Sequence, residues 1–279
     1  MLQKLQNYFE SVPDSHRLAL LFGTLFIFWL IEDRKKNINN TEKFKHAKLN
    51  SLFMFTAAPV QLVFGISLTY LAKMEVTHHF GLLNYFSFSQ NFFFQIVATF
   101  IILDFFEYVY HVIMHKIKVL WMFHLVHHSD RVVDVSTTLR EHPGETAARL
   151  AMSLLWVLIS GASMWAIVFH QFIQIVSNII AHSNVRLNEK TDKIVGSVFI
   201  TPNLHQVHHH YKQPYTDSNY GDILSVWDHL FGTFRRVEVQ KDEFGIDSCM
   251  DHEENSNFVN LIKLPFGKYR APLEEKTSL

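Results

Sequence analysis

Four long apolar stretches set the hydrophobic pattern of this chain, and they cover residues 17–31, 49–72, 92–110 and 147–181. A helix that crosses a membrane needs about 20 mainly apolar residues. The first stretch is short, but Val12 and Pro13 lead into it. The second contains Pro59, which we expect to kink a membrane helix without breaking it. We therefore interpret each of the first three stretches as one membrane helix.

The fourth stretch is longer than a single bilayer crossing needs, and Ser160 and Gly161 interrupt it. It fits either one tilted helix or two helices that turn at the glycine. We favour the helical hairpin because the length exceeds one crossing and because glycine is a frequent turn residue.

This pattern predicts an all-α protein, namely an integral membrane helical bundle with a cytoplasmic helical cap. Residues 1–90 form an N-terminal membrane anchor with two transmembrane helices, and residues 91–236 form the functional domain. Residues 237–279 are more polar, and we expect a C-terminal tail that packs loosely on the cap.

Composition agrees with a membrane protein, because hydrophobic residues make up 48% of the chain and charged residues only 18%. Soluble domains contain roughly 25% charged residues. The formal net charge of −1 gives no indication of nucleic-acid binding. The single cysteine, Cys249, excludes an internal disulfide and a cysteine-based metal site. No cleavable signal peptide is expected.

Histidines are the most informative polar residues, and most of the 18 lie between residues 111 and 210. They form three boxes, which are His111-x3-His115, His124-x2-His127-His128 and His205-x2-His208-His209. Residues at i, i+3 and i+4 share one face of a helix, so each box can direct its imidazoles toward one point. Imidazole suits zinc, copper, iron and nickel. Eight histidines are too many for one ion and about right for two.

Two polar stripes accompany the boxes. Asp104 and Tyr108 precede His111 and His115 on one face of the third apolar helix. A carboxylate at membrane depth marks a functional interior by default, unless Asp104 lies at the interface. A second stripe lies near the end of the fourth stretch and consists of Gln171, Gln174, Asn178 and His182. It either faces the metal site or, for the two glutamines, supplies hydrogen bonds between helices.

The distribution of basic residues predicts the orientation in the membrane. Residues 73–91 contain one basic residue, Lys73. Residues 32–48 contain Arg34, Lys35, Lys36, Lys43, Lys45 and Lys48. Residues 32–48 are therefore expected in the cytoplasm. With a hairpin at 147–181, all three boxes lie on the cytoplasmic side.

Five segments, LWMFHLVHHSD, STTLREHPGE, AHSN, TPNLHQVHHH and NYGDILSVWDHLFGTF, together resemble the fatty acid hydroxylase superfamily, also called the sterol desaturase family. The resemblance covers roughly residues 95–236, so that 91–236 reads as a hydroxylase-like catalytic domain. It implies a membrane-bound oxidase with two iron ions and O2 as co-substrate. Such enzymes hydroxylate or desaturate sterols, sphingolipids, fatty acyl chains or alkylglycerols. It also implies an external electron donor such as cytochrome b5, ferredoxin or a reductase.

The resemblance also implies roles for single residues. We expect Asn178 to contact a metal directly or through water, and Asp104, Glu107 and Glu145 to accept hydrogen bonds from imidazole N–H groups. Asp104, Glu145 and Asn178 are thus the candidate catalytic residues. The pattern of Arg140, His142, Pro143 and Glu145 is common in the family, and His210 extends the third box. The implied ligands are His111, His115, His124, His127, His128, His182, His205, His208 and His209.

Two other functions are compatible with clustered histidines. A histidine-lined metal transporter would place its ligands along a pathway at mid-membrane, whereas most histidines here follow the third apolar helix. A zinc-dependent membrane hydrolase would be favoured by an H-E-x-x-H helix, and the sequence contains no such motif.

Overall fold

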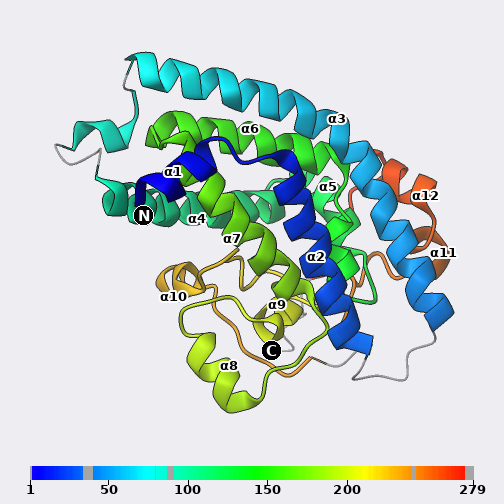
Figure 1. Cartoon of the computed structure of the whole chain (residues 1–279). Helices are drawn as coiled ribbons and strands as arrows, with labels where there is room; N and C mark the ends of the chain where they lie inside the picture. The colour runs from blue at the N-terminus through cyan, green and yellow to red at the C-terminus, as the bar shows by residue number, and fades with distance from the viewer. Residues whose placement is uncertain (1, 34–39, 79, 87–90, 240–242, 274–279) are drawn as a thin grey trace.

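The computed structural model describes residues 2–33, 40–78, 80–86, 91–239 and 243–273, and these are organised as helices (Figure 1). The described residues contain no named strand, only two isolated β-bridges. The predicted all-α class is therefore confirmed. The helices are α1 (Leu2–Glu10), α2 (Asp14–Asp33), α3 (Asn40–His78), η1 (Leu82–Tyr85), α4 (Phe92–Lys116), α5 (Lys118–His128), η2 (Val135–Leu139), α6 (Pro143–Ser160), α7 (Met164–His182), α8 (Glu189–Val195), α9 (Pro202–His208), α10 (Val226–Phe231), α11 (His252–Asn255), α12 (Phe258–Lys263) and η4 (Leu264–Phe266).

Four helices are long and apolar enough to cross a membrane, which confirms a multi-pass membrane protein. Their membrane-compatible segments are Asp14–Glu32, Thr41–Leu68, Phe92–Lys116 and Met164–His182. Figure 1 shows α6 lying between α3 and α4, with α2 and α7 crossing in front of them. The shorter helices α8, α9 and α10 gather at one end of the bundle, below α7 in the picture.

The fourth apolar stretch forms two helices, α6 and α7, that turn at Gly161, as the sequence indicated. Gly161 has a φ of 64°, a left-handed conformation that glycine adopts without a steric penalty. A side chain at this position would also lie 2.2 Å from the carbonyl oxygen of Phe80. Of the two helices only α7 is long and apolar enough on its own to span a bilayer, so the expectation of a second complete span in α6 is not supported.

The end of the bundle that carries α8, α9 and α10 is called the cap here. Buried polar contacts connect this end with α2 and α3. The Glu32 carboxylate accepts hydrogen bonds from the backbone N–H groups of Val135 and Asn184, at 3.1 and 2.6 Å. Lys43 of α3 forms a buried ion pair with Glu32 at 3.5 Å. These contacts hold the ends of α2 and α3 against the loops that flank the histidine-bearing helices.

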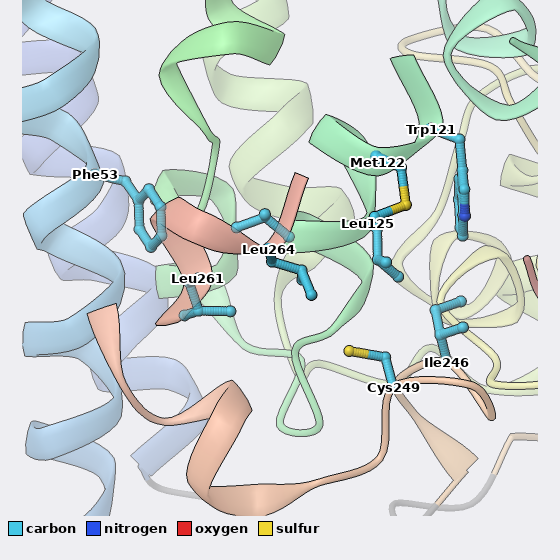
Figure 2. Close-up of a cluster of buried hydrophobic side chains, with 9 residues drawn as sticks. Phe53, Trp121, Met122, Leu125, Ile246, Cys249, Leu261 and Leu264 are labelled. Atoms are coloured by element: carbon cyan, nitrogen blue, oxygen red, sulfur yellow. The ribbon is translucent and has the colours of Figure 1, made fainter. Parts of the chain in front are cut away.

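The C-terminal segment is part of the core, and the expected loose packing of residues 237–279 is wrong for the described residues. Ile246, Cys249, Leu261 and Leu264 are at most 5% exposed. They pack with residues of α3 and α5 in one hydrophobic cluster, which Figure 2 shows. Trp121 of α5 donates a hydrogen bond from its indole N–H to the Arg270 carbonyl at 2.7 Å. The segment therefore supports the back of α5.

Candidate metal centre

The structure brings all nine predicted ligand histidines together in two groups, each with its candidate ligand atoms within 4.8 Å of one another. Group A contains His111 and His115 from α4, His124 and His128 from α5, and His208 from α9. Group B contains His127 from α5, His182 from α7, His205 from α9, and His209, which caps α9. Consecutive residues of a helix point about 100° apart, so His127 and His128 serve different groups.

Backbone carbonyl groups fix the orientation of four of these rings. A carbonyl oxygen accepts hydrogen bonds but cannot donate them, so the ring nitrogen beside it must carry the proton. The other nitrogen then presents a lone pair to the interior of the group, as metal ligation requires. The pairs are His111 Nδ1 with Tyr220 O at 2.9 Å, His127 Nδ1 with Arg140 O at 3.2 Å, His182 Nδ1 with Asn178 O at 2.9 Å, and His208 Nδ1 with Ser218 O at 2.8 Å.

Two lone pairs of group B then face one another without a proton between them. His127 Nε2 and His182 Nε2 are 3.0 Å apart, and both rings have their proton on Nδ1. Two lone pairs at this distance repel each other unless a cation lies between them. Two nitrogen ligands at about 2.1 Å from one ion lie roughly 3 Å apart at right angles. The donor set therefore fits a metal ion in group B.

Group A passes a similar test. The Nε2 atoms of His115 and His208 are buried and have no hydrogen-bond partner among the described residues. His111 Nε2, which carries no proton, lies 3.2 Å from His124 Nε2. Buried polar atoms normally find a partner, so unpartnered imidazole nitrogens that converge indicate a ligand. Both groups consist of imidazoles alone, which suits iron or zinc and does not suit magnesium or calcium.

Two carboxylates complete the shell around group A. Glu145 Oε1 lies 2.6 Å from His124 Nδ1, in agreement with its predicted position, and Asp217 Oδ1 lies 3.1 Å from His115 Nδ1. Burial alone would raise the pKa of Asp217, but the hydrogen bonds from His115 and Lys116 and the charge of Lys116 hold that pKa below its usual value. The Asp217 carboxylate is therefore ionised and can offset positive charge in group A.

The ring environment keeps the histidines neutral. Burial, together with neighbouring imidazoles, holds the pKa of His128, His208 and His209 well below its usual value. Neutral imidazole is the form that binds metal ions, so these rings are ready to act as ligands at physiological pH.

Asp104 occupies a different place from the one expected. Its carboxylate accepts hydrogen bonds from the backbone N–H groups of Ile223 and Leu224, at 3.1 and 3.3 Å, and from the indole of Trp227 at 2.8 Å. Among the described residues it has no hydrogen bond to an imidazole, so the expected contact is wrong. Asp104 instead fastens the segment that follows the third box to α4.

Asn178 also differs in detail from the expectation. Its backbone carbonyl orients His182, while its side-chain amide donates to Asp222 Oδ1 at 3.4 Å. Gln174, one turn earlier on α7, donates to Asp222 Oδ2 at 2.8 Å. The second polar stripe therefore faces Asp222 along part of its length and group B at its end, where His182 lies.

The remaining box-associated histidines lie outside both groups. His142 caps the start of α6, because its Nδ1 accepts from Gly144 N at 2.9 Å. His210 Nδ1 accepts from Lys212 N at 3.1 Å. The Arg140–Glu145 segment nevertheless contributes to the site, since the Arg140 carbonyl holds His127 and the Glu145 carboxylate contacts His124.

The sequence did not reveal that one short segment, Asp217–Thr233, lies against the whole polar stripe of α4. The Asp217 side chain and the Tyr220 carbonyl hold His115 and His111, and the Ser218 carbonyl holds His208. Thr233 Oγ1 lies 3.1 Å from the Tyr108 hydroxyl. The only sequence signal was the motif NYGDILSVWDHLFGTF, which contains most of this segment but does not indicate which atoms face the site.

The fold and the site define a membrane protein with a buried centre made of two imidazole groups. Comparison with known proteins agrees with this, because the sequence model described as fatty acid hydroxylase matches residues 96–233, about half of the chain. The chain belongs to the fatty acid hydroxylase family. A membrane-bound oxidoreductase of the hydroxylase class, as predicted, is confirmed.

Individual relatives point to the same family. The chain is 25% identical over 238 residues to the ornithine lipid hydroxylase OlsE of Rhizobium tropici, which covers 81% of this chain and 70% of that protein. It is 30% identical over 132 residues to the alkylglycerol monooxygenase of Caenorhabditis elegans, covering 47% of this chain and 25% of that protein. It is 27% identical over 153 residues to the human alkylglycerol monooxygenase, covering 53% of this chain and 32% of that protein. This chain thus spans about a quarter to a third of those monooxygenases. No solved structure matches the chain.

Proposed function

We propose that this protein is an O2-dependent di-iron hydroxylase that acts on an unactivated C–H position of a membrane lipid. The observation that carries the proposal is the pair of buried imidazole groups in which carbonyl acceptors direct unprotonated Nε2 atoms inward. Five ligands in group A and four in group B are the nine histidines that the sequence singled out.

Bound iron would supply the oxygen chemistry, and the protein supplies the rest. The carbonyl groups of Arg140, Asn178, Ser218 and Tyr220 hold four rings in the tautomer that binds metal. Asp217 places negative charge against His115, and the buried carboxyl group of Glu145 forms a hydrogen bond with His124. Fixed acceptors of this kind reduce the reorganisation that a change of metal charge would require.

The names of the relatives suggest the substrate class. Ornithine lipids and alkylglycerols are both lipids with a polar head group and a long chain, and we propose a substrate of this kind. Hydroxylation by O2 inserts one oxygen atom into the C–H bond and reduces the other to water. That reduction takes two electrons and two protons, so we also propose an external electron donor such as cytochrome b5, ferredoxin or a reductase.

We place both groups on the cytoplasmic side. Three of the basic residues expected in the cytoplasm lie near the start of α3, namely Lys43, Lys45 and Lys48, and Lys116 ends α4. Both helix ends adjoin the cap. Arg34, Lys35 and Lys36 lie outside the described residues. Since His111 ends a stretch of α4 that is roughly 29 Å long from Phe92 at about 1.5 Å per residue, group A lies near the membrane boundary.

The test is metal analysis and turnover of the purified protein, with a matched pair of variants on one helix. His182→Ala removes a ligand of group B, whereas His170→Ala removes a buried histidine of α7 that belongs to neither group. We expect about two irons in the unaltered protein and in His170→Ala, and about one in His182→Ala with turnover abolished. Equal iron in all three proteins would refute the assignment of group B. Lipid analysis of a strain with and without the protein then identifies the substrate.

The two alternative functions predict different results. A metal transporter would exchange its ions readily and consume no O2, and a zinc hydrolase would contain zinc and release a hydrolytic product. Among the described residues, group A has five imidazoles and group B has four. This does not favour the hydrolase, because catalytic zinc sites commonly have three protein ligands and one open position.

A further inference from the structure

The cap carries a patch of exposed apolar side chains close to the membrane helices. We define the cap patch as Ile194, Val198, Phe199, Val226, Leu230 and Phe231, which are 39–68% exposed. The two contributing segments lie side by side, because Ser225 N donates to Val198 O at 2.9 Å and Phe199 forms a β-bridge with Leu224. Large side chains gathered in this way on a surface usually mark a site of contact with a partner or a membrane.

The cap patch continues a surface of α4 that is itself compatible with a membrane. Phe93, Val97 and Ile101 follow one another at intervals of four residues and are 63%, 54% and 44% exposed. The next residue of that stripe is Phe105. Its ring lies 5.0 Å from the ring of Trp227 and 6.0 Å from that of Phe231. The apolar surface of the α4 membrane segment therefore passes directly onto α10.

The position of α10 along α4 places it within bilayer depth. Phe105 and Tyr108 lie roughly 20 and 24 Å along α4 from Phe92, at about 1.5 Å per residue. The hydrocarbon core is about 30 Å thick. Phe231 stacks on Tyr108 with ring centroids 5.4 Å apart. If α4 crosses the membrane from Phe92, α10 lies beside its inner-leaflet part.

The inner side of α10 satisfies its polar groups, and the outer side carries the apolar residues of the patch together with one exposed histidine, His229. Asp228 is fully buried and accepts from Tyr220 N at 2.7 Å and Gly221 N at 2.9 Å. The indole N–H of Trp227 is bonded to Asp104. Exposed polar backbone is costly in hydrocarbon, and the helical and side-chain hydrogen bonds of this segment reduce that cost.

We propose that the cap patch is embedded among the acyl chains of the leaflet in which α4 ends. In Figure 1 the two helices that contribute to the patch, α8 and α10, lie below α7 and α4. A consequence, which rests on the proposed function, is that a lipid reaches group A from this side. A series of ring contacts connects the patch with group A. The ring of Phe231 stacks on that of Tyr108, the ring centroids of Tyr108 and Tyr220 are 6.3 Å apart, and those of Tyr220 and His111 are 5.6 Å apart.

Site-directed fluorescence in lipid nanodiscs tests the insertion. Cys249 is the single cysteine and is 1% exposed, so a Cys249→Ser background removes the only other thiol. An environment-sensitive probe is attached at Leu230→Cys on the patch, at Phe55→Cys on the exposed face of the α3 membrane segment, and at Glu253→Cys on α11. Val198→Cys reports on the patch from the other segment.

We expect brominated phosphatidylcholine to quench the probes at Leu230 and Val198 nearly as strongly as the probe at Phe55. The Glu253 probe should be quenched only by aqueous iodide. If both patch probes behave like Glu253 in protein that retains its metal, the patch faces water and the proposal is refuted. Metal content identifies any variant that fails to fold.

Kinetics tests the consequence separately. Leu230→Glu places a charge on the patch, whereas Val259→Glu places one on an exposed residue of α12. We expect Leu230→Glu to raise the apparent KM for a bilayer lipid at least about tenfold with little change in kcat, and Val259→Glu to change neither. An unchanged KM with a membrane-inserted probe would refute the approach from this side. No turnover in the unaltered protein would refute the proposed function and leave the fluorescence result standing.

Discussion

Asp217 offers the sharpest test of how the protein holds group A, because it contacts a ligand histidine without belonging to either group. Its Oδ1 lies 3.1 Å from His115 Nδ1, and its Oδ2 lies 2.5 Å from Lys116 Nζ. Asp217→Ala leaves the buried Nδ1 of His115 without an acceptor. The ring can then rotate or change its tautomer, and group A loses the charge that offsets a bound cation.

The size of the effect follows from these contacts. Outer partners of ligand histidines typically contribute 10–100-fold to metal affinity. The hydrogen bond to His115 is of ordinary length, and the Asp217 side chain is 22% exposed, so solvent screens part of its charge. We therefore expect the lower end, about tenfold weaker binding at group A, or about 1.4 kcal/mol. Asp217→Asn keeps an acceptor oxygen and should cost roughly half of that free energy.

The assay is the iron content of purified protein after equilibration with a graded series of chelator concentrations. Asp217→Ala should release one iron at about tenfold lower chelator than the unaltered protein, while the second iron follows the original curve. Lys116→Met is the matched control, because it removes only the exposed partner, whose side chain is 55% accessible. Exposed ion pairs contribute about 0–1 kcal/mol, so its release curve should stay near the original.

Two outcomes would contradict this reasoning. If both irons shift together in Asp217→Ala, the residue stabilises the fold as a whole and does not act through His115. If neither iron shifts, the carboxylate does not orient the ligand. A shift of equal size in Lys116→Met would assign the effect to the lysine.

Three further predictions concern other parts of the molecule. Asn178→Ala removes the hydrogen bond to Asp222 but keeps the backbone carbonyl that holds His182. The variant should therefore retain both irons, and its turnover should fall less than about tenfold. Loss of an iron would show that the Asn178 side chain is a ligand. Metal-free protein should lose thermal stability as the pH falls from 7 to 5.5. Unfolding restores the ordinary pKa of buried histidines such as His128 and His209, so the unfolded chain binds more protons than the folded one. A melting temperature that stays constant or rises over this pH range would contradict the prediction. Lys45→Cys, at an exposed position of α3, should resist thiol reagents applied from the outer face, and labelling from that face would reverse the proposed orientation.

The helices and the ligand histidines were predictable because both leave a periodic signal. Apolar runs of membrane length have few alternative structures, and spacings of three and four residues place imidazoles on one face. The division into two groups was not predictable. It depends on α4 contributing only to group A and α7 only to group B, while α5 and α9 contribute to both, so that adjacent residues, His127 and His128, meet different partners.

The surroundings of the ligands were less accessible from the sequence, for a chemical reason. Four of the ring acceptors are backbone carbonyls, which every residue possesses. Glu145 was predictable because its side chain is distinctive and its motif familiar. The packing of residues 237–279 was missed because its apolar residues come in short runs, such as 244–246 and 258–266, that are separated by polar segments.

The polar stripe of α4 shows how a correct pattern led to a wrong role for one of its members. Asp104, Tyr108, His111 and His115 do share one face, and that face contacts the segment Asp217–Thr233 along its length. A polar stripe on an apolar helix requires polar partners, but it does not say whether they are metal ions or protein atoms. Asp104 and Tyr108 meet protein atoms, and only the two histidines also reach group A. Asp104 and Tyr108 thereby fix the segment whose carbonyl and carboxylate oxygens orient His111 and His115. The orientation of these two ligands in group A therefore depends on a contact of Asp104 that lies two helical turns away from His111.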